Sequence, residues 1–585
     1  MVEVSDYAGG VTVNRCAVWA PNAVRVAVET RGVRLLMAAA GRGWFELQDG
    51  CVEAGDDYAF VLDGGEPRPD PRSSWQPHGV HGASRAVDHD AFGWTDQLWR
   101  GRSLCDSVVY ELHTGTFSEP GTFDGAAEHI GHLVELGVGA VELLPVTAFP
   151  GMRGWGYDGV DLFAVHEAYG GPAALKRFVD ACHRAGIAVL MDVVYNHLGP
   201  DGNYLGEFGP YFTDRYRTPW GDAVNYDGPG SDEVRRFVVD NALMWLRDYH
   251  CDGLRLDAVH AIVDTSAVHL LEEISTAVHS LSVELGRELW VIAESDLNDP
   301  RVVNDVGLGG YGCDAQWSDA FHHALHATLT GEHGGYYSDF GRVEDVALSL
   351  DNVFVNPGGY SPFRERRHGR AVGNLPRTRF LGYMQNHDQV GNRAQGERSA
   401  ALMSTGRLQV AAALVLLGPF VPMLLAGEEW AASTPFQYFT DHEDAALGEL
   451  VSDGRRREFA SFGWDPADVP DPQDVATFER SKLRWNELDR EPHATVLRWH
   501  RELIALRASL PALRSGDRAD VSVEFDEAMR WLVMRRPGIV VACNWGGDPA
   551  QLPVTVTTVL LSSADVVVTE GGLLLPPDSV AVGLA

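Results

Sequence analysis

The sequence predicts an α/β protein built around a (β/α)₈ TIM barrel, with a β-sandwich before the barrel and a β-domain after it. The chain has 585 residues, which is too long for one simple hydrophobic core. Its middle part alternates apolar strand-like runs with amphipathic helices, whereas both ends carry only short runs broken by Gly, Pro and Asp. Together these observations predict three domains, spanning residues 1–88, 89–512 and 513–585.

The N-terminal domain, residues 1–88, is predicted to be a small immunoglobulin-like β-sandwich. The run CAVWAPNAVRVAVET (16–30) has strand character, and no helical periodicity is evident in this part of the sequence. The segment 63–82 is rich in Pro and Gly, so it marks the exit into the next domain.

The central domain, residues 89–512, is predicted to hold eight parallel strands. Near-continuous hydrophobic strands that alternate with helices are typical of a parallel sheet covered on both faces. Eight such units favour a closed barrel over an open sheet. The clearest helices are 171–186 and 231–250, and the last is 494–509. The predicted strands are 107–116, 139–147, 187–197, 253–260, 289–295, 312–318, 379–388 and 421–429.

Two further stretches complete the predicted organisation. Residues 513–585 return to short strands and form the C-terminal β-domain. The apolar stretch 411–427 is interrupted by Gly418, Pro419 and Pro422. We therefore expect a buried helix followed by a buried strand there, and no transmembrane segment.

The composition excludes several classes of function. The formal charge is −35, which argues against binding to nucleic acids or anionic membranes and is compatible with neutral substrates such as sugars. The seven cysteines are scattered and include no CxxC pair, as expected for reduced thiols in the cytoplasm. Residues 1–13 lack the basic start and apolar run of a signal peptide, so we expect a cytoplasmic protein. The sequence does not predict an oligomeric state.

Polar side chains end four of the predicted strands. In barrel enzymes the active site lies where the carboxyl ends of the strands meet. A single carboxylate at a strand end is more often a helix cap, but carboxylates at four strand ends, with arginine and histidines beside them, favour a functional site. These residues are Asp192, Asn196, His197, Arg255, Asp257, His260, Glu294, Asn386, His387 and Asp388.

Clustered carboxylates suit three chemistries. These are divalent metal binding, glycoside cleavage by a carboxylate pair and proton abstraction beside a metal. Aromatic residues help to choose among them, because aromatic rings stack on the apolar faces of sugars. Trp155 and Tyr157 follow the second strand, and the long loop 198–232 contributes Trp220 and Tyr226. A sugar substrate is therefore favoured.

Four short motifs carry a family resemblance. DVVYNH (192–197), GLRLDAVH (253–260), VIAES (291–295) and YMQNHD (383–388) are similar to the four motifs of the α-amylase family of glycoside hydrolases, in the same order. They fall on the strands predicted as third, fourth, fifth and seventh. Residues 18–28 also resemble the glucan-binding type of sandwich domain that precedes the barrel in branching and debranching relatives.

The resemblance implies roles for three carboxylates. Asp257 matches the nucleophile that forms a covalent glycosyl-enzyme, and Glu294 matches the general acid that later acts as the base. Asp388 matches the third carboxylate, which orients the sugar hydroxyls and supports a distorted ring. The family's reaction retains the configuration of the sugar.

The resemblance also implies substrate contacts. Arg255 matches the guanidinium beside the nucleophile. His197 and His387 match hydrogen-bond donors to the reactive sugar, and Tyr157 resembles the ring that stacks on it. We further expect His260 to contact the leaving sugar.

These roles require particular charges nearby. A nucleophilic carboxylate must stay ionised, which Arg255 on the same strand face as Asp257 favours. An acid must keep its proton, so we expect Glu294 to lie beside Asp257 and Asp388 and away from cations.

Three stretches narrow the resemblance within the family. Residues 363–370, 435–464 and 469–485 resemble the family's trehalose-releasing hydrolases more than its branching enzymes or isoamylases. This likeness implies hydrolysis of the α-1,4 bond next to the terminal trehalose of a maltooligosyltrehalose, with Asp441 in the loop near the leaving group. The run Arg455–Arg457 either contacts that side or forms a solvated helix face.

Two alternatives stay open. A glycogen branching or debranching enzyme would use the same carboxylates. A non-catalytic glucan-binding protein would keep the scaffold, although such proteins usually lose a catalytic carboxylate. Some relatives bind calcium through the asparagine that matches Asn196, but the loop 198–232 has no pattern such as DxDxDG, so no metal is expected. No nucleotide cofactor is expected either, because the sequence contains no P-loop or dinucleotide fingerprint.

Overall fold

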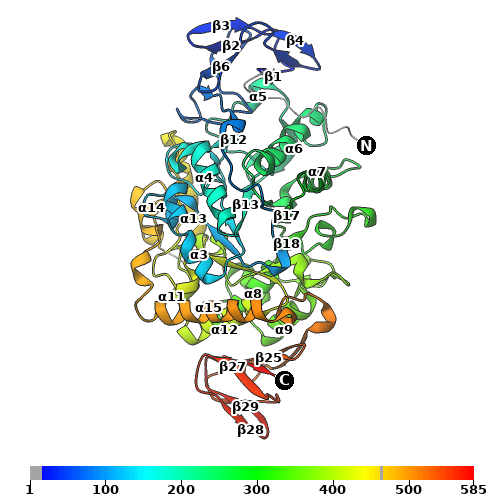
Figure 1. Ribbon diagram of the computed structural model, residues 1–585, viewed down its shortest axis with the longest axis vertical. Coiled ribbons are helices and arrows are strands. Elements are labelled where there is room, and N and C mark those ends of the chain that lie inside the picture. Colours follow the sequence, from blue (N-terminus) through cyan, green and yellow to red (C-terminus); the bar gives the residue numbers. More distant parts are fainter. Residues whose placement is uncertain (1–15, 462–464) are drawn as a thin grey trace.

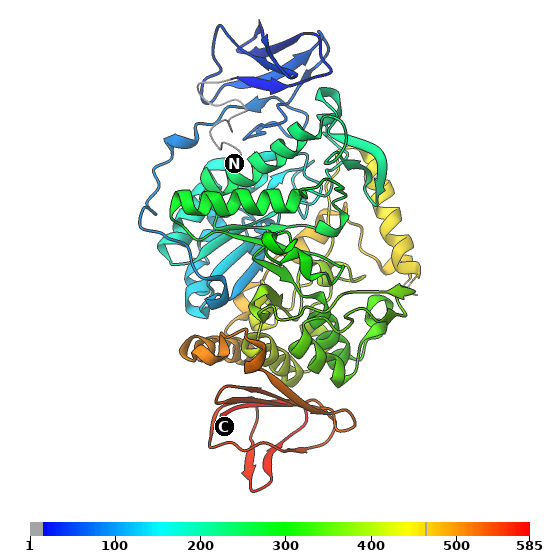
Figure 2. The same cartoon turned by 90° about the vertical axis from the view of Figure 1, so that its right-hand side faces the viewer.

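The computed structural model describes residues 16–461 and 465–585 and has three parts along one long axis (Figure 1). The N-terminal strands lie at one end, the barrel in the middle and the C-terminal strands at the other end (Figure 2). The expectation that residues 1–13 lack a signal peptide falls outside the described residues. No helix in the described part of the chain is both long and apolar enough to cross a membrane.

Eight parallel strands close into a barrel, which confirms the predicted fold class. Each strand pairs with the next in chain order, and the eighth pairs with the first. The strands are buried along their whole length, as expected for a sheet covered on both faces. They are β9 (Val109–Leu112), β10 (Ala140–Leu143), β13 (Ala188–Val193), β16 (Gly253–Leu256), β17 (Trp290–Ala293), β18 (Ala315–Trp317), β21 (Phe380–Gly382) and β22 (Val421–Leu425).

The barrel interior is a core distinct from the layer between the barrel and its helices. Successive residues of a strand point to opposite sides. On β16, Leu254 and Leu256 therefore join the outer core, while Arg255 lies inside the barrel over the ring of Trp317. The apolar interior consists mainly of Val109, Ala140, Ala188, Leu190, Trp290, Ile292, Ala315, Trp317, Leu381, Tyr383, Val421 and Met423.

Helices cover the barrel where the amphipathic pattern predicts them. α4 (Gly171–Arg184), α6 (Ser231–Arg247) and α15 (His493–Ser509) coincide with the three predicted helices. α12 (Thr405–Leu417) is buried from Gln409 onward and leads into β22. This arrangement confirms the buried helix and strand expected at 411–427.

Antiparallel sheets form both ends of the molecule. The N-terminal sheets consist of β1 (Ala17–Trp19), β5 (Trp44–Glu46) and β4 (Ala38–Gly41), and of β3 (Val33–Leu36), β2 (Val26–Thr30), β6 (Asp57–Leu62), β7 (Pro67–Arg68) and β8 (Ser84–Arg85). The C-terminal sheets consist of β23 (Ser522–Asp526), β24 (Trp531–Arg536), β25 (Ile539–Asn544), β30 (Ser579–Leu584) and β27 (Thr558–Ser562), and of β26 (Ala550–Leu552), β29 (Gly572–Leu575) and β28 (Val567–Thr569). Side chains from both C-terminal sheets share one apolar core.

The long loop after β13 packs against the N-terminal strands. It contains α5 (Leu205–Phe208) and the hairpin of β14 (Phe212–Thr218) and β15 (Gly221–Val224). Trp19 of β1 meets the ring of Tyr211 edge-on, with ring centres 5.3 Å apart. The N-terminal strands therefore support this loop through packing contacts.

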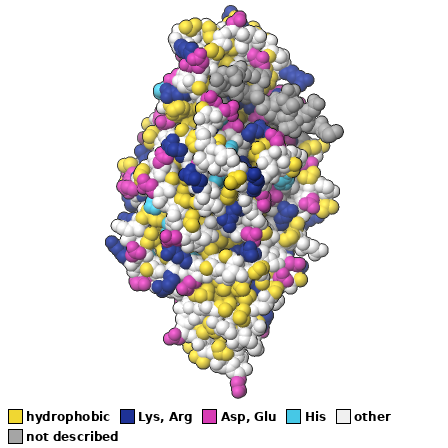
Figure 3. Space-filling view, viewed as in Figure 1, with side chains coloured by type: hydrophobic (Ala, Val, Ile, Leu, Met, Phe, Trp, Pro, Cys, Tyr) yellow, Lys and Arg dark blue, Asp and Glu magenta, His cyan; other side chains and the backbone are white. Residues whose placement is uncertain are grey.

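Charges of both signs are mixed on the face of the molecule that Figure 3 shows. On the face shown in Figure 3, Lys and Arg side chains are interspersed with Asp and Glu. This pattern differs from the continuous basic patch that nucleic-acid binding uses. The expected absence of a nucleic-acid partner stays a prediction.

A buried histidine ties the start of the barrel domain to the base of the barrel. His183 of α4 lies between Asp96 (2.8 Å) and Asp252 (2.9 Å), and Trp99 stacks on its ring with centres 4.7 Å apart. Asp252 also accepts the backbone N–H of Val189 in β13 at 2.9 Å. The pKa of His183 lies above its ordinary value, because the two carboxylates raise it more than burial lowers it.

We expect His183→Gln to reduce stability by about 3 kcal/mol near pH 6, because two buried carboxylates lose their charged partner. A raised folded-state pKa means that the native protein holds the proton more tightly than the unfolded chain does. The stabilisation is therefore fully present below the unfolded pKa of about 6.5 and is lost as the pH rises through the folded-state pKa. Urea midpoints of both proteins across this pH range measure the difference.

The matched control is His279→Gln, which removes a histidine–carboxylate pair at the surface, where His279 is 44% exposed. We expect it to cost at most about 1 kcal/mol. Equal losses in the two variants, or a His183→Gln loss that does not change with pH, would contradict the prediction.

Candidate active site

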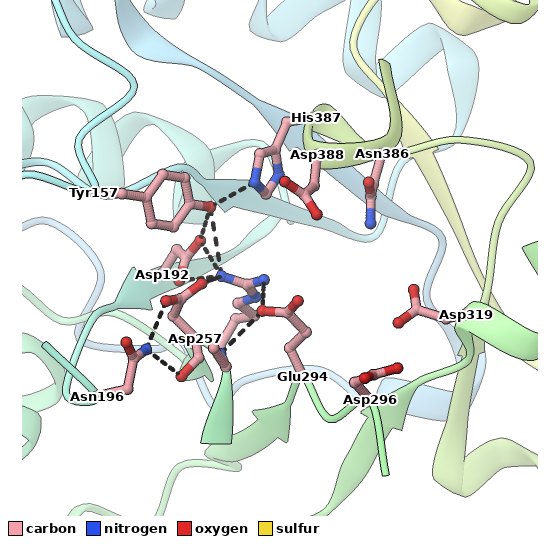
Figure 4. Close-up of polar contacts among 12 residues, drawn as sticks. Tyr157, Asp192, Asn196, Asp257, Glu294, Asp296, Asp319, Asn386, His387 and Asp388 are labelled. Carbon is pink, nitrogen blue, oxygen red and sulfur yellow. Dashed lines mark hydrogen bonds and ion pairs between the residues drawn. The ribbon is translucent and has the colours of Figure 1, made fainter. Parts of the chain in front are cut away.

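A single buried guanidinium forms the centre of the site (Figure 4). Arg255 is 1% exposed, and its guanidinium lies 4.2 Å from the ring centre of Trp317. Nη1 donates to Asp192 at 2.7 and 2.8 Å and to Asp257 at 2.9 Å, and Nη2 donates to Glu294 at 2.5 Å. The parallel register sets Asp192 directly opposite Arg255 and so assembles this cluster from neighbouring strands.

Asp257 lies immediately after β16. Asn196 Nδ2 donates to its Oδ2 at 2.6 Å and to its backbone carbonyl at 2.9 Å, while Arg255 binds Oδ1. The next residue, Ala258, has a φ of 37°, a left-handed conformation that is strained for a residue with a Cβ. This conformation directs the Ala258 N–H to Glu294 Oε2 at 3.0 Å. The strained turn after Asp257 therefore also holds the second carboxyl group of the pair, Glu294.

The surroundings of Glu294, which follows β17, correct one expectation. The sequence argument placed this side chain away from cations, yet Arg255 and the Ala258 N–H both donate to its Oε2. The expectation was wrong because Arg255, in the middle of the strand ends, reaches the carboxylates on both neighbouring strands. Within residues 16–461 and 465–585, no group hydrogen-bonds the other oxygen, Oε1, so half of the carboxyl group is available.

Tyr157 connects two sides of the barrel mouth. Its hydroxyl donates to Asp192 at 2.7 Å and lies 2.8 Å from Nε2 of His387. Its ring stacks on that imidazole with centres 5.2 Å apart and planes inclined by 19°. The ring is only half-buried, so part of it borders the open mouth.

The partner of His387 is a carboxylate that the sequence reasoning missed. Glu111 on β9 accepts the backbone N–H of His387 at 2.9 Å and lies 2.5 Å from its Nδ1. Burial lowers the pKa of His387, but Glu111 raises it more, and the resulting pKa is above the ordinary value. The available signal was a carboxylate inside the otherwise apolar run VVYEL.

Other acids lie deeper in the barrel. Burial raises the pKa of Asp192 to about 6, although Arg255 opposes the shift. Glu142, the register neighbour of Glu111, is 1% exposed, and one of its oxygens has no hydrogen-bond partner within residues 16–461 and 465–585. Burial, and then the charge of Glu111, holds the pKa of Glu142 well above its usual range.

Asp388 is the second residue of the short helix α10 (His387–Gly391). Asn392, one turn further on, donates to its Oδ1 at 2.6 Å. Burial and the nearby Glu294 raise the pKa of Asp388, while His387 lowers it. Figure 4 shows Asp388 and His387 on the opposite side of the site from Glu294.

An aromatic wall forms the loop side of the mouth. The rings of His197 and Trp220 stack with centres 4.3 Å apart, and Trp220 is 49% exposed. Nε2 of His197 lies 3.1 Å from the carbonyl of Tyr157. Tyr226 is 2% exposed and donates to the carbonyl of Tyr195, so it supports the loop and its ring is not open to a sugar.

Trp155 lies behind the mouth. It is buried, its Nε1 donates to the carbonyl of Gln437 at 2.9 Å, and its ring stacks on Phe436 with centres 5.2 Å apart. Its ring meets that of Tyr157 at 6.5 Å. Trp155 therefore supports Tyr157 from behind, and its direct contact with a sugar stays a prediction.

His260 and Asp441 lie at two further places on the rim. His260 is exposed, and its Nδ1 accepts the N–H of Asp296 at 3.4 Å. Asp441 accepts the N–H of Met152 at 2.8 Å and binds Arg153 at 2.5 Å. His260 is therefore open to a ligand beside the loop that follows Glu294. The carboxylate of Asp441 already accepts hydrogen bonds from protein donors.

Among the described residues, this site offers no set of side chains suited to bind a metal ion. Within residues 16–461 and 465–585, no three His, Cys, Asp or Glu side chains gather in a group that could hold a metal ion. In the carboxylate cluster the guanidinium of Arg255 occupies the position between the oxygens.

Family comparisons agree with this site. The model described as "Alpha amylase, catalytic domain" matches residues 88–218, and a domain of unknown function, DUF3459, matches residues 516–582. The chain is similar to a crystal structure titled as an alpha amylase from Salmonella typhimurium, with a TM-score of 0.90, 37% identity and 98% and 97% of the two chains covered. The fold and the site define a glycoside hydrolase of the α-amylase family.

Curated relatives show which family within this class the chain belongs to. A malto-oligosyltrehalose trehalohydrolase of Arthrobacter ramosus is 52% identical, with 91% of this chain and 95% of the relative covered. One of Rhizobium sp. (strain M-11) is 49% identical over the full length of both chains. A 1,4-alpha-glucan branching enzyme of Pseudoalteromonas atlantica is 31% identical over only 59% of this chain. The chain belongs to the malto-oligosyltrehalose trehalohydrolase family.

We expect Glu111→Gln to lower kcat/KM by about ten- to a hundredfold, because the amide holds the imidazole of His387 less firmly and misplaced groups cost rates of this order. Losing the charge of Glu111 also lowers the pKa of His387. If catalysis uses the protonated imidazole, the alkaline limb of the kcat/KM profile moves to lower pH. Glucan hydrolysis measured from pH 5 to 9 checks both effects.

Glu142→Gln is the matched control, because it replaces the register neighbour of Glu111, whereas Glu111 is the carboxylate that binds His387. We expect its pH profile to overlay that of the wild type. A Glu111→Gln profile with an unmoved alkaline limb, or equal shifts in both variants, would refute the role given to Glu111.

Proposed function

We propose that the protein hydrolyses the α-1,4-glucosidic bond next to the terminal trehalose of maltooligosyltrehalose and releases trehalose with retention of configuration. The observation that carries the proposal is the pair of carboxylates, Asp257 and Glu294, bound by the two terminal nitrogens of one guanidinium. Retaining hydrolysis needs a carboxyl pair about 5–5.5 Å apart, closer than inverting hydrolysis allows. Retention is general to the family.

Asp257 acts as the nucleophile in this proposal. Its Oδ1 binds Arg255 and its Oδ2 binds Asn196, which fixes the position and direction of the carboxylate. Attack on the anomeric carbon forms a glycosyl-enzyme ester and breaks the bond to the leaving oxygen. The leaving oxygen takes the proton of Glu294. Water that is deprotonated by Glu294 then cleaves the ester.

The two oxygens of Glu294 support separate tasks. Oε2 is held by Arg255 and the Ala258 N–H, which fixes the direction of the carboxyl group. The open oxygen, Oε1, is the one that would deliver and later receive the proton. The same residue thus serves both steps without releasing Arg255.

The reactive sugar is proposed to lie among Asp388, His387 and Tyr157. Tyr157 offers part of an aromatic face, and Asp388 offers an acceptor for hydroxyl groups. Both ring nitrogens of His387 already face protein groups, Glu111 and the Tyr157 hydroxyl, so its donation to a sugar hydroxyl stays a prediction. The stacked pair of His197 and Trp220 supports a further aromatic contact at the rim.

A cavity beside Glu294 supports a disaccharide as the leaving group. Figure 4 shows Asp296 and Asp319 beyond Glu294, on the side away from Asp257. Both line a cavity of about 250 Å³ that also contains Tyr336 and Arg364. Carboxylates, a guanidinium and an aromatic ring together suit a compact molecule with many hydroxyls, and the acid's side is where the leaving group must lie.

We also propose a cytoplasmic setting for the enzyme. All seven cysteines are unpaired, and five of them are buried. This pattern supports a reducing compartment.

Product analysis tests the proposed substrate. We expect free trehalose to be the major early product from maltotetraosyl-trehalose, with slower cleavage of maltohexaose and no change in the iodine stain of glycogen. Chromatography of the products under initial-rate conditions measures this. A changed glycogen stain without trehalose would support the alternative of a branching or debranching enzyme and reject our proposal.

Variants of the carboxylates test their roles. We expect Asp257→Ala to lower kcat by at least about 10⁴-fold, because no glycosyl-enzyme forms. We expect Glu294→Gln to release one fluoride per enzyme from α-maltosyl fluoride, since fluoride leaves without a proton, and then to stall without a base. Added azide, which needs no base, should restore turnover in Glu294→Gln only. Near-normal hydrolysis by Asp257→Ala would mark the protein as using another nucleophile.

A further inference from the structure

A helix far along the chain reaches the partner of the third carboxylate. α13 (Ala445–Ser461) carries three consecutive arginines, Arg455–Arg457. The first of them donates from Nη1 to Oδ1 of Asn392 at 3.0 Å. Asn392 in turn donates from Nδ2 to Oδ1 of Asp388 at 2.6 Å. We propose that Arg455 positions Asp388 through Asn392, which rests on the role given to Asp388 in the proposed function.

The chemistry of the asparagine amide explains why a side chain that only donates is needed. An amide group has one oxygen that accepts and one NH₂ that donates, and either end can face a neighbour. Arginine only donates, so Arg455 can bind only the oxygen of Asn392. The NH₂ end is then left facing Asp388, where it can donate to the carboxylate. The reverse orientation would place two acceptors against each other.

The guanidinium of Arg455 is itself held in place. It lies 5.0 Å from the ring centre of Tyr438 and 4.7 Å from that of Phe459, and its side chain is 11% exposed. Its second terminal nitrogen, Nη2, donates to the carbonyl of Gly391 at the end of α10. Two bonds to consecutive residues therefore fix the end of the helix that carries Asp388.

Gly391 leaves little room for this helix to shift. A Cβ at this position would lie 2.0 Å from Cζ2 of Trp155, which only glycine avoids. The indole ring and Arg455 thus both contact the last turn of α10. Trp155 acquires a supporting role here that does not require contact with a sugar.

The two following arginines do something different. Arg456 pairs with Asp453 at 3.3 Å and Asp471 at 3.0 Å, and Arg457 is exposed. The sequence left open whether the run contacts the site or forms a solvated face. In the structure one member contacts a partner of the site, while Arg457 lies on the solvated face.

Arg455→Met tests the proposal, because methionine keeps much of the apolar stem between the two rings and removes both donors. We expect kcat on maltotetraosyl-trehalose to fall about ten- to a hundredfold, with KM within about threefold of the wild-type value, since Asp388 acts mainly in the transition state. Arg455→Lys, which keeps one donor for Asn392, should recover most of this loss. Arg457→Ala, two positions further along the helix, should equal the wild type.

A double variant separates positioning from general structural support. If Arg455 acts through Asn392, the Arg455→Met/Asn392→Ala protein should be no slower than Asn392→Ala alone. The inference would be overturned if the rate losses of the two single variants multiply in the double variant. A kcat of Arg455→Met equal to that of the wild type would also overturn it. The proposed function would survive either of these outcomes if the wild type releases trehalose and Asp388→Asn is inactive. Should the wild type release no trehalose, the proposed function falls, and the same variants are compared on the glucan that it does cleave.

Discussion

The binding of three carboxylates by one buried guanidinium is the interaction on which the site depends. Arg255 and Asp192 are almost out of contact with water, and unpaired charges at such depth are costly. Their mutual bonds offset that cost only if β13, β16 and β17 keep their register. The closed barrel supplies this register, because each strand is fixed on both edges. A shift of one residue would turn Arg255 toward the helices and leave the carboxylates unpaired.

A second set of groups is anchored from other strands and from loops. Glu111 on β9 orients His387, Tyr157 connects that imidazole to Asp192, and Asn392 holds Asp388. The contacts of His387 with Glu111 and Tyr157 join segments that are far apart in the sequence, whereas Asn392 lies only four residues after Asp388. The mouth of the barrel is therefore a continuous network, in which the groups proposed to touch substrate have directions set by groups that do not.

The sequence predicts the parts of this arrangement that follow from local pattern. Eight apolar runs give the eight strands, and polar residues at their ends give Asp257 and Glu294, because periodicity and strand ends are visible in a single chain. Hydrogen-bond partners that come from other segments of the chain cannot be recognised from local sequence patterns. Arg255 was assigned to Asp257 on its own strand, whereas the structure shows it shared with the carboxylates of both neighbouring strands. Arg455 and Asn392 are 63 residues apart, and nothing in their local sequence links them.

Sharing one guanidinium among three carboxylates also suits the two steps of a retaining reaction. In the proposed mechanism, Asp192, Asp257 and Glu294 all face Arg255 before the attack. Esterification would remove the charge of Asp257 and leave Asp192 and Glu294 as the carboxyl partners of Arg255. The proposed change of Glu294 from acid to base would therefore take place beside a guanidinium that stays bound to it. No movement of the barrel is needed, because Arg255 already holds Oε2 while Oε1 stays open to the substrate.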